Sequence, residues 1–118
     1  NTIIESITGK PITLYRPPYG LVSPMLLPVC RKLHLKTVLW NVNSYDFRRE
    51  HYSIIVTRVV KRLTDGAILL FHDRHHSDAT LDYSSTASAL EGLLAKCSYA
   101  KFESVTVSRL LERGGVCP

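Results

Sequence analysis

Three polar side chains that could do chemistry each follow a predicted β-strand of this 118-residue chain. His72 comes directly after Ile68–Phe71, an apolar run typical of a strand buried on both faces. Asp46 and Arg16 follow two earlier predicted strands. Ligand sites of α/β proteins lie past the carboxyl ends of parallel strands. We therefore expect His72, Asp46 and Arg16 to converge on one cavity.

His72 is the acid–base candidate of this set, because the unperturbed pKa of histidine is about 6.5 and suits proton transfer at neutral pH. Simpler alternatives stay open. His72 could be a polar residue that only ends its strand, and Asp46 could cap the helix that follows.

The segment from Arg16 to Gly20 predicts a stiff loop. Pro17 and Pro18 fix the backbone φ angle and remove two N–H donors, so the loop stays extended until Gly20 releases it. Such a loop would hold the Arg16 side chain and aim the backbone N–H of Tyr19 in a fixed direction. Alternatively, the two prolines only end a strand.

Helices and strands are predicted to alternate along the whole chain. Periodicity and capping signals predict helices over residues 1–8, 23–33, 50–64, 86–96 and 108–113, and strands over 11–15, 36–42, 68–71 and 102–107. Strict alternation implies parallel strands with right-handed crossovers, and hence an α/β fold. We expect residues 1–118 to form a single unit, an open sheet or about half of a (β/α) barrel, whose full form takes about 250 residues.

Composition argues against several classes of protein. Hydrophobic residues make up 45% and charged residues 21%, as in a folded domain rather than a disordered segment. The net charge of +5 would suit an anionic partner, but the basic residues are scattered, so we do not expect nucleic-acid binding. No apolar run approaches the roughly 18 residues of a membrane span.

Cys30, Cys97 and Cys117 show no CxxC spacing, and a disulfide among them cannot be assigned.

Three segments, in this order, resemble the later motifs of the polysaccharide deacetylases, the NodB-homology domain of carbohydrate esterase family 4. Arg16–Gly20 resembles the R-x-P-[YF] loop of the third motif. Trp40–Phe47 resembles the fourth motif, D-x-x-D-W, and Leu70–His72 resembles the fifth, L-x-H. Phe102–Leu111 is similar to the family's last strand and its ending. The resemblance covers nearly the whole chain.

The resemblance implies a distorted, incomplete (β/α) barrel that uses a divalent metal to remove acetyl groups from N-acetylglucosamine units of chitin or peptidoglycan, or from xylan. His72 would then protonate the leaving amine. Asp46 would hold the His72 ring and tune its proton affinity, and Arg16 would orient a catalytic base. The Tyr19 backbone N–H would help to stabilise the oxyanion, and Leu70 would line the pocket for the acetyl methyl group.

The fourth motif departs from the family pattern at two positions. Asn43 stands where its first aspartate is expected, and Phe47 replaces its tryptophan. Trp40, at the start of this segment, is a further substrate-side candidate. The departures leave an alternative open, in which the chain is a non-catalytic module of the same fold that binds glycan or serves a structural role. A small stand-alone α/β binding domain is a third hypothesis.

The family's first two motifs, T-F-D-D-G and H-[ST]-x-x-H, are missing from the chain, which has no adjacent Asp-Asp pair. His72 and His76 mimic the spacing of the second motif, but Asp73 is neither Ser nor Thr, and the run follows the third-motif loop. We interpret it as the fifth motif, with His75 and His76 as loop residues.

The missing motifs supply the metal ligands and the base, so the resemblance implies that these lie upstream of Asn1. We expect a carboxyl-terminal half domain without metal ligands of its own, inactive in isolation, from a longer protein whose metal is zinc by family default. Its partners would be an acetylated polysaccharide and either the missing half or a second copy. We expect no signal peptide within these residues, and the resemblance alone implies a secreted or cell-surface protein.

Overall fold

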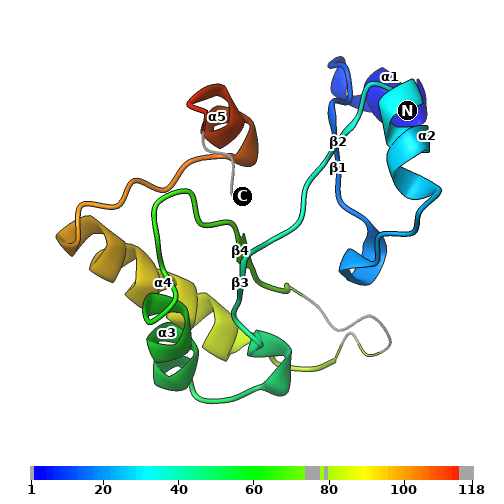
Figure 1. Ribbon diagram of the computed structural model, residues 1–118. Helices are drawn as coiled ribbons and strands as arrows, with labels where there is room; N and C mark the ends of the chain where they lie inside the picture. The colour runs from blue at the N-terminus through cyan, green and yellow to red at the C-terminus, as the bar shows by residue number, and fades with distance from the viewer. Residues whose placement is uncertain (1, 74–77, 79, 115–118) are drawn as a thin grey trace. The chain divides into compact units, whose positions relative to one another are not determined.

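The computed structural model describes residues 2–73, 78 and 80–114, and the chain divides into two units, Asn1–Leu39 and Trp40–Pro118 (Figure 1). Each unit contains helices and one two-stranded ladder, and both ladders are parallel. The predicted α/β class with parallel strands is therefore confirmed. No helix in the described ranges is long and apolar enough to cross a membrane.

The first unit places a short parallel ladder next to two helices. Its elements are α1 (Thr2–Thr8), β1 (Leu14–Tyr15), the 3-10 helix η1 (Pro18–Gly20), α2 (Leu26–Lys32) and β2 (Lys36–Thr37). β1 pairs with β2, with Leu14 opposite Lys36 and Tyr15 opposite Thr37. α1 ends at Gly9, whose φ of +65° is the left-handed conformation that a helix C-cap requires.

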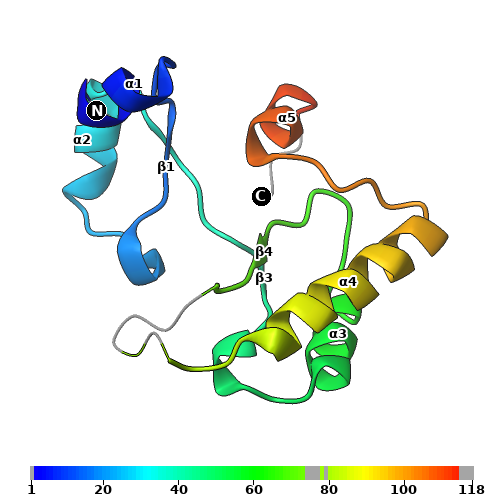
Figure 2. The same cartoon turned by 180° about the vertical axis from the view of Figure 1, so that it is seen from behind.

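The second unit carries the other ladder and the two longest helices. Its elements are β3 (Val42–Asn43), the 3-10 helix η2 (Asp46–Arg48), α3 (Tyr52–Val60), β4 (Leu69–Leu70), α4 (Ser84–Tyr99) and α5 (Val107–Glu112). β3 pairs with β4, with Val42 opposite Leu69 and Asn43 opposite Leu70. α3 and α4 pack against each other, as both views show (Figures 1 and 2).

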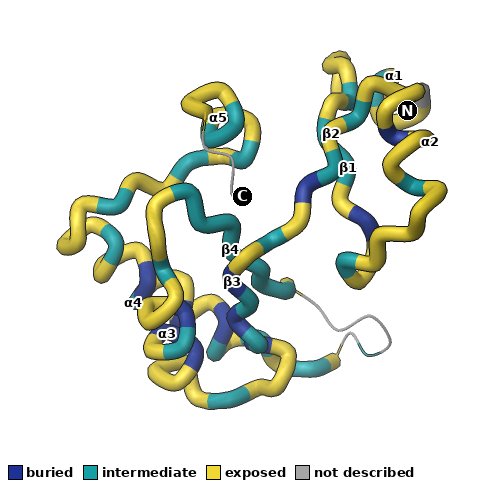
Figure 3. Tube along the Cα trace, viewed as in Figure 1, coloured by how far each residue is buried: buried dark blue, intermediate teal, exposed yellow. Residues whose placement is uncertain are grey.

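The core of the second unit lies between these two helices and one face of the β3–β4 ladder. Its buried apolar side chains are Val42, Ile55, Val56, Val59, Ala89 and Leu93 (Figure 3). Ala67, Leu69 and Phe71, at alternate positions in and around β4, pack against this core. All four residues of the run 68–71 are only half-buried. The expectation of a strand buried on both faces is therefore wrong for this chain.

The strand predicted over residues 36–42 is two separate strands. Between them, the side-chain oxygen of Asn41 accepts the backbone N–H of Ile68 at 2.8 Å, where a backbone carbonyl would continue a ladder. The backbone N–H groups of Asn41 and Val42 share the Ile68 carbonyl, each at 3.2 Å. β2 and β3 consequently belong to different ladders.

The strand predicted over residues 102–107 is also absent from the described part of the chain. Phe102 instead donates its backbone N–H to the Cys97 carbonyl at 2.9 Å, which closes the end of α4. The Thr106 hydroxyl accepts the N–H of Arg109 at 3.3 Å and so caps α5. Alternation alone does not make a strand here, since no neighbouring strand pairs with this segment.

Candidate active site

Asp46 is the most buried charged side chain of the second unit, with 1% of the residue exposed. It lies three residues after the end of β3 and begins η2. Its Oδ1 atom accepts the Ser44 hydroxyl at 2.8 Å, and its backbone N–H reaches back to the same hydroxyl at 3.3 Å. The Thr86 hydroxyl, from the first turn of α4, donates to Oδ2 at 3.1 Å. Two buried hydroxyl groups thus hold the carboxylate, one from a residue just before Asp46 in the sequence and one from a helix far after it.

His72 is bound to the same carboxylate twice. Its backbone N–H donates to Asp46 Oδ2 and its ring Nδ1 lies against Oδ1, both at 2.8 Å. The parallel register explains why His72 and Asp46 are close together. β3 and β4 end side by side, and just beyond them the Ser44 N–H bonds the Leu70 carbonyl at 3.2 Å. The structure therefore brings together two of the residues that the sequence placed at strand ends.

The hydrogen bonds define which ring nitrogen of His72 is available. An ionised carboxylate only accepts hydrogen bonds, so Nδ1 carries the proton in the bond to Asp46. No group in the described ranges hydrogen-bonds Nε2, and 35% of the His72 side chain is exposed. Nε2 can therefore give or take a proton at the surface while Nδ1 stays anchored.

The pKa of the Asp46 carboxyl is lowered from its ordinary value, although two effects oppose each other. Burial would raise the pKa, because it disfavours the charged form. The hydrogen bonds from the His72 ring, the His72 backbone N–H and the Ser44 hydroxyl favour the carboxylate, as does the attraction of the imidazole charge. Together these donors outweigh burial, so Asp46 stays ionised beside the histidine.

Arg58 on α3 braces the loop that carries Asp46. Its Nη1 donates to the Ser44 carbonyl at 2.7 Å, and its Nη2 forms an ion pair with Glu50. Within the loop, Asn43 accepts the backbone N–H of Tyr45 at 2.9 Å, which supports the left-handed conformation of Tyr45 (φ +54°). Asn43 thus has a local structural role at the position where the family motif has aspartate.

Ser44, Thr86 and Arg58 are functional contacts that the sequence analysis missed. Thr86 and Arg58 lie on helices, and their contacts to Asp46 and to the Ser44 carbonyl span 40 and 14 residues, so no local signal predicts them. Ser44 could have been noticed, because Ser-x-Asp spacing lets the hydroxyl bond both the backbone and the carboxylate two residues on.

The other predicted site residues divide between the two units. Arg16 and Tyr19 belong to the first unit; Arg16 is exposed and Tyr19, in a left-handed conformation, is 80% exposed. Leu70 and Trp40 belong to the second unit and are half-buried. The two units are not placed relative to each other, so the convergence of Arg16 with His72 stays a prediction.

The described residues do not suit a metal centre. They contain no group of three or more His, Cys, Asp and Glu side chains that could hold an ion. Both oxygens of Asp46 are already engaged by hydrogen-bond donors, and Nδ1 of His72 is engaged by Asp46. Cys30 and Cys97 are free thiols, whereas Cys117 lies outside the described residues, together with His75 and His76.

Comparison with known proteins decides the family. No protein-family model matches the chain. The peptidoglycan-N-acetylglucosamine deacetylase PgdA of Listeria monocytogenes is 33% identical over 103 residues, and the peptidoglycan-N-acetylmuramic acid deacetylase PdaC of Bacillus subtilis is 33% identical over 110 residues. These matches take in 87% and 93% of the chain, but the chain spans only about a fifth of each relative (20% and 21%).

Solved structures agree with these matches. The PdaC structure aligns with a TM-score of 0.74 at 32% identity, covering 94% of this chain and 50% of that one. A mutant, with restored enzymatic activity, of a family 4 carbohydrate esterase pseudoenzyme from Bacillus anthracis aligns with a TM-score of 0.81 at 25% identity, covering 94% and 38%. The chain belongs to carbohydrate esterase family 4. The described residues form no closed barrel, and family 4 deacetylases are generally metal-dependent.

Proposed function

We propose that the protein carrying this chain removes acetyl groups from an acetylated glycan, with His72 as the proton donor to the leaving group. The observation that carries the proposal is the buried Asp46 carboxylate, which holds the backbone N–H and the ring Nδ1 of His72 at once and leaves Nε2 unengaged by it, on a side chain that is 35% exposed. The 33% identity to two peptidoglycan deacetylases supports this reaction class.

The chemistry requires a proton at one defined atom. Hydrolysis of an N-acetyl group breaks the bond between the carbonyl carbon and the sugar nitrogen, and that nitrogen must take up a proton as it leaves. A protonated His72 can donate it from Nε2, while Asp46 remains ionised and keeps the ring oriented. Ser44 and Thr86 act as positioning residues, because they touch Asp46 rather than the substrate.

The remaining catalytic groups are part of the proposal by family resemblance. Arg16 would orient the catalytic base, the Tyr19 N–H would stabilise the oxyanion, and Leu70 would contact the acetyl methyl group, with Trp40 on the substrate side. The base and the ligands of a divalent metal, zinc by family default, would come from outside the described residues. A glycan substrate of this kind places the protein at the cell surface or outside the cell.

A His72→Asn substitution in the intact protein tests the proposal. We expect the release of acetate from N-acetylated glycan to fall by about 100- to 10,000-fold, the usual contribution of a general acid. Circular dichroism should match that of the unsubstituted protein, because asparagine keeps a side-chain N–H donor for Asp46 and the backbone N–H of residue 72 still bonds Oδ2. Acetate release that is unchanged by the substitution would refute the proton-donor role.

A non-catalytic glycan-binding module is the second candidate. It is favoured by Asn43 and Phe47, which depart from the family motif, and by the similarity to a pseudoenzyme of the same family. Binding of acetylated glycan without any acetate release from the intact, metal-supplied protein would favour this alternative.

A further inference from the structure

A continuous strip of rings leads away from His72 along the loop after β3. The Phe47 ring meets the His72 ring edge to face, with centroids 5.6 Å apart and planes at 88°. The Tyr45 ring lies 5.9 Å further on, and the Arg48 guanidinium sits 4.7 Å from the centre of the Tyr45 ring. Phe47 is 43% exposed, so the strip presents apolar surface beside the proposed proton donor.

The charge of Arg48 is not neutralised by any carboxylate in the described part of the chain, in contrast to that of Arg58. Arg58 also approaches the Tyr45 ring, at 5.7 Å, but its donors are committed to Glu50 and to the Ser44 carbonyl. Arg48 is exposed, and within the described part of the chain its guanidinium lies over the Tyr45 ring and pairs with no carboxylate. A guanidinium that lies over a ring keeps its N–H groups directed outward in its own plane.

Such a group is suited to one kind of ligand. A planar carboxylate can accept two parallel N–H bonds from a guanidinium. Contact with the Tyr45 ring already restricts the Arg48 side chain, so less conformational entropy is lost when a ligand binds. The exposed face of Phe47, between Arg48 and His72, offers apolar surface to the ring of a sugar. The loop after β3 thus places a stacking surface and a carboxylate receptor beside the proton donor that follows β4.

We propose that Arg48 binds a carboxylate carried by the glycan, next to the sugar that is deacetylated, so that the protein selects acidic over neutral acetylated glycans. This inference rests on the proposed function for its sugar ligand. The carboxylate could belong to the lactyl group of a muramic acid or to a uronic acid. Both are carboxylates on a sugar, and the experiment separates them.

The test measures the affinity of the intact protein for three acetylated oligosaccharides of equal length by titration calorimetry. One contains muramic acid, one contains uronic acid, and one contains only neutral N-acetylglucosamine. We expect Arg48→Met, which keeps an unbranched apolar stem over Tyr45, to weaken binding of the preferred acidic glycan by about tenfold, the value of a charge-assisted hydrogen bond. Affinity for the neutral glycan should not change.

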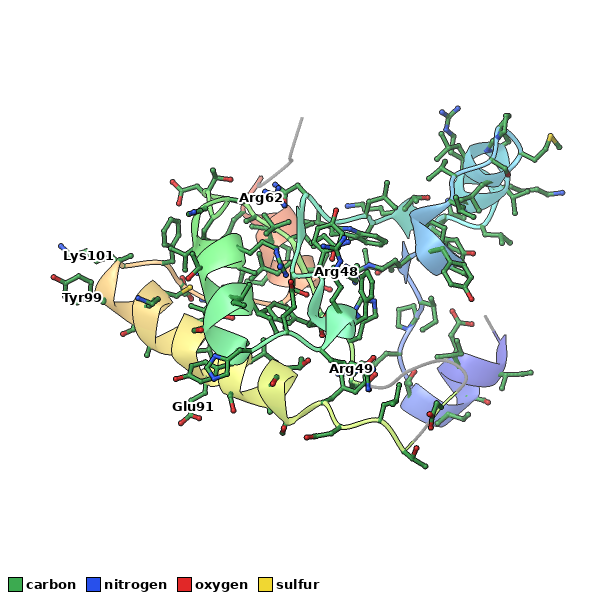
Figure 4. All side chains as sticks on the ribbon, turned by 90° about the horizontal axis from the view of Figure 1, so that it is seen from below. Arg48, Arg49, Arg62, Glu91, Tyr99 and Lys101 are labelled. Atoms are coloured by element: carbon green, nitrogen blue, oxygen red, sulfur yellow. The ribbon has the colours of Figure 1, made fainter. Side chains whose placement is uncertain are left out.

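Arg62→Met is the matched control. Arg62 is also exposed and lies beyond the carboxyl end of α3, whereas Arg48 precedes its amino end (Figure 4). It should change none of the three affinities. Phe47→Ala should weaken all three glycans, because the stacking surface serves acidic and neutral sugars alike.

The outcomes separate this inference from the proposed function. Tighter binding of an acidic glycan than of the neutral one, lost in Arg48→Met, supports the inference even where no acetate is released. The acidic glycan whose affinity falls in Arg48→Met identifies the source of the carboxylate. Equal affinities of all three glycans, equal losses for all three with Arg48→Met, or no measurable binding of either acidic glycan overturn the inference. Acetate release from the neutral glycan would still leave the proposed function intact.

Discussion

Two carboxylates of the second unit, Asp46 and Glu103, have strong hydrogen-bond donors but opposite surroundings. The side chain of Glu103 is 55% exposed and pairs with Arg113 at 2.6 Å and Arg109 at 3.5 Å. The Asp46 side chain is fully buried and meets neutral hydroxyls, a backbone N–H and one imidazole. Both carboxyl groups have a lowered pKa, Glu103 mainly through the hydrogen bond from Arg113.

The difference teaches that the direction of a pKa shift does not identify a functional carboxylate. Around Glu103, water and salt screen the charges, and such surface pairs contribute little to folding. Around Asp46, water is excluded, so each hydrogen-bond donor contributes to stability. The loss of any one donor leaves a buried polar group without a partner. The environment of Asp46 therefore fixes a geometry, whereas that of Glu103 only holds two arginines near a helix end.

The largest expected effect comes from Asp46→Ala. The substitution leaves the buried hydroxyls of Ser44 and Thr86 without their acceptor and releases His72. We expect the free energy of unfolding of the intact protein to fall by about 3 kcal/mol, measured by denaturant titration. A loss well below 1 kcal/mol would show that the network is not formed in solution. Glu103→Gln is the matched control and should leave the unfolding midpoint unchanged at physiological salt.

A smaller effect is expected from Thr86→Val, which keeps the shape of the side chain and removes the hydroxyl. Because the lost hydrogen bond goes to a charged, buried acceptor, the free energy of unfolding should fall by about 1.5 kcal/mol. If Thr86 positions Asp46, then kcat should fall with little change in KM, and Thr86→Ser should restore most of both stability and kcat. Little loss with Val, or a larger loss with Ser than with Val, would indicate that Thr86 serves packing alone.

The smallest effect is the dependence of stability on pH. Because the pKa of Asp46 is lower in the folded protein than in the unfolded chain, the unfolded chain binds protons first as the pH falls. The stabilisation is complete above the unfolded value of about 4 and is lost as the pH falls through the folded pKa. Asp46→Asn should flatten the stability profile between about pH 5 and pH 2. A profile as steep as that of the unsubstituted protein would assign the acid sensitivity to other groups.

The sequence predicted those parts of the site that depend on local pattern. An apolar run that stops at His72 and a polar segment after β3 correctly indicated strand ends, and parallel strands bring such ends together. Thr86 could not be predicted, because an isolated threonine in a helix gives no sign of a partner 40 residues away. The pattern also failed at Asn41, where a side-chain amide replaces a ladder carbonyl, and at residues 102–107, where alternation finds no neighbouring strand.

Nitrogen NMR of the His72 ring in the intact protein tests the central claim most directly. The structure requires Nδ1 to carry the proton that bonds Asp46, so in the neutral ring Nε2 should carry no proton. Asp46→Asn should abolish this preference for one tautomer. A neutral His72 ring that keeps its proton on Nε2, or a ring whose tautomer is the same with and without the Asp46 carboxylate, would contradict the account.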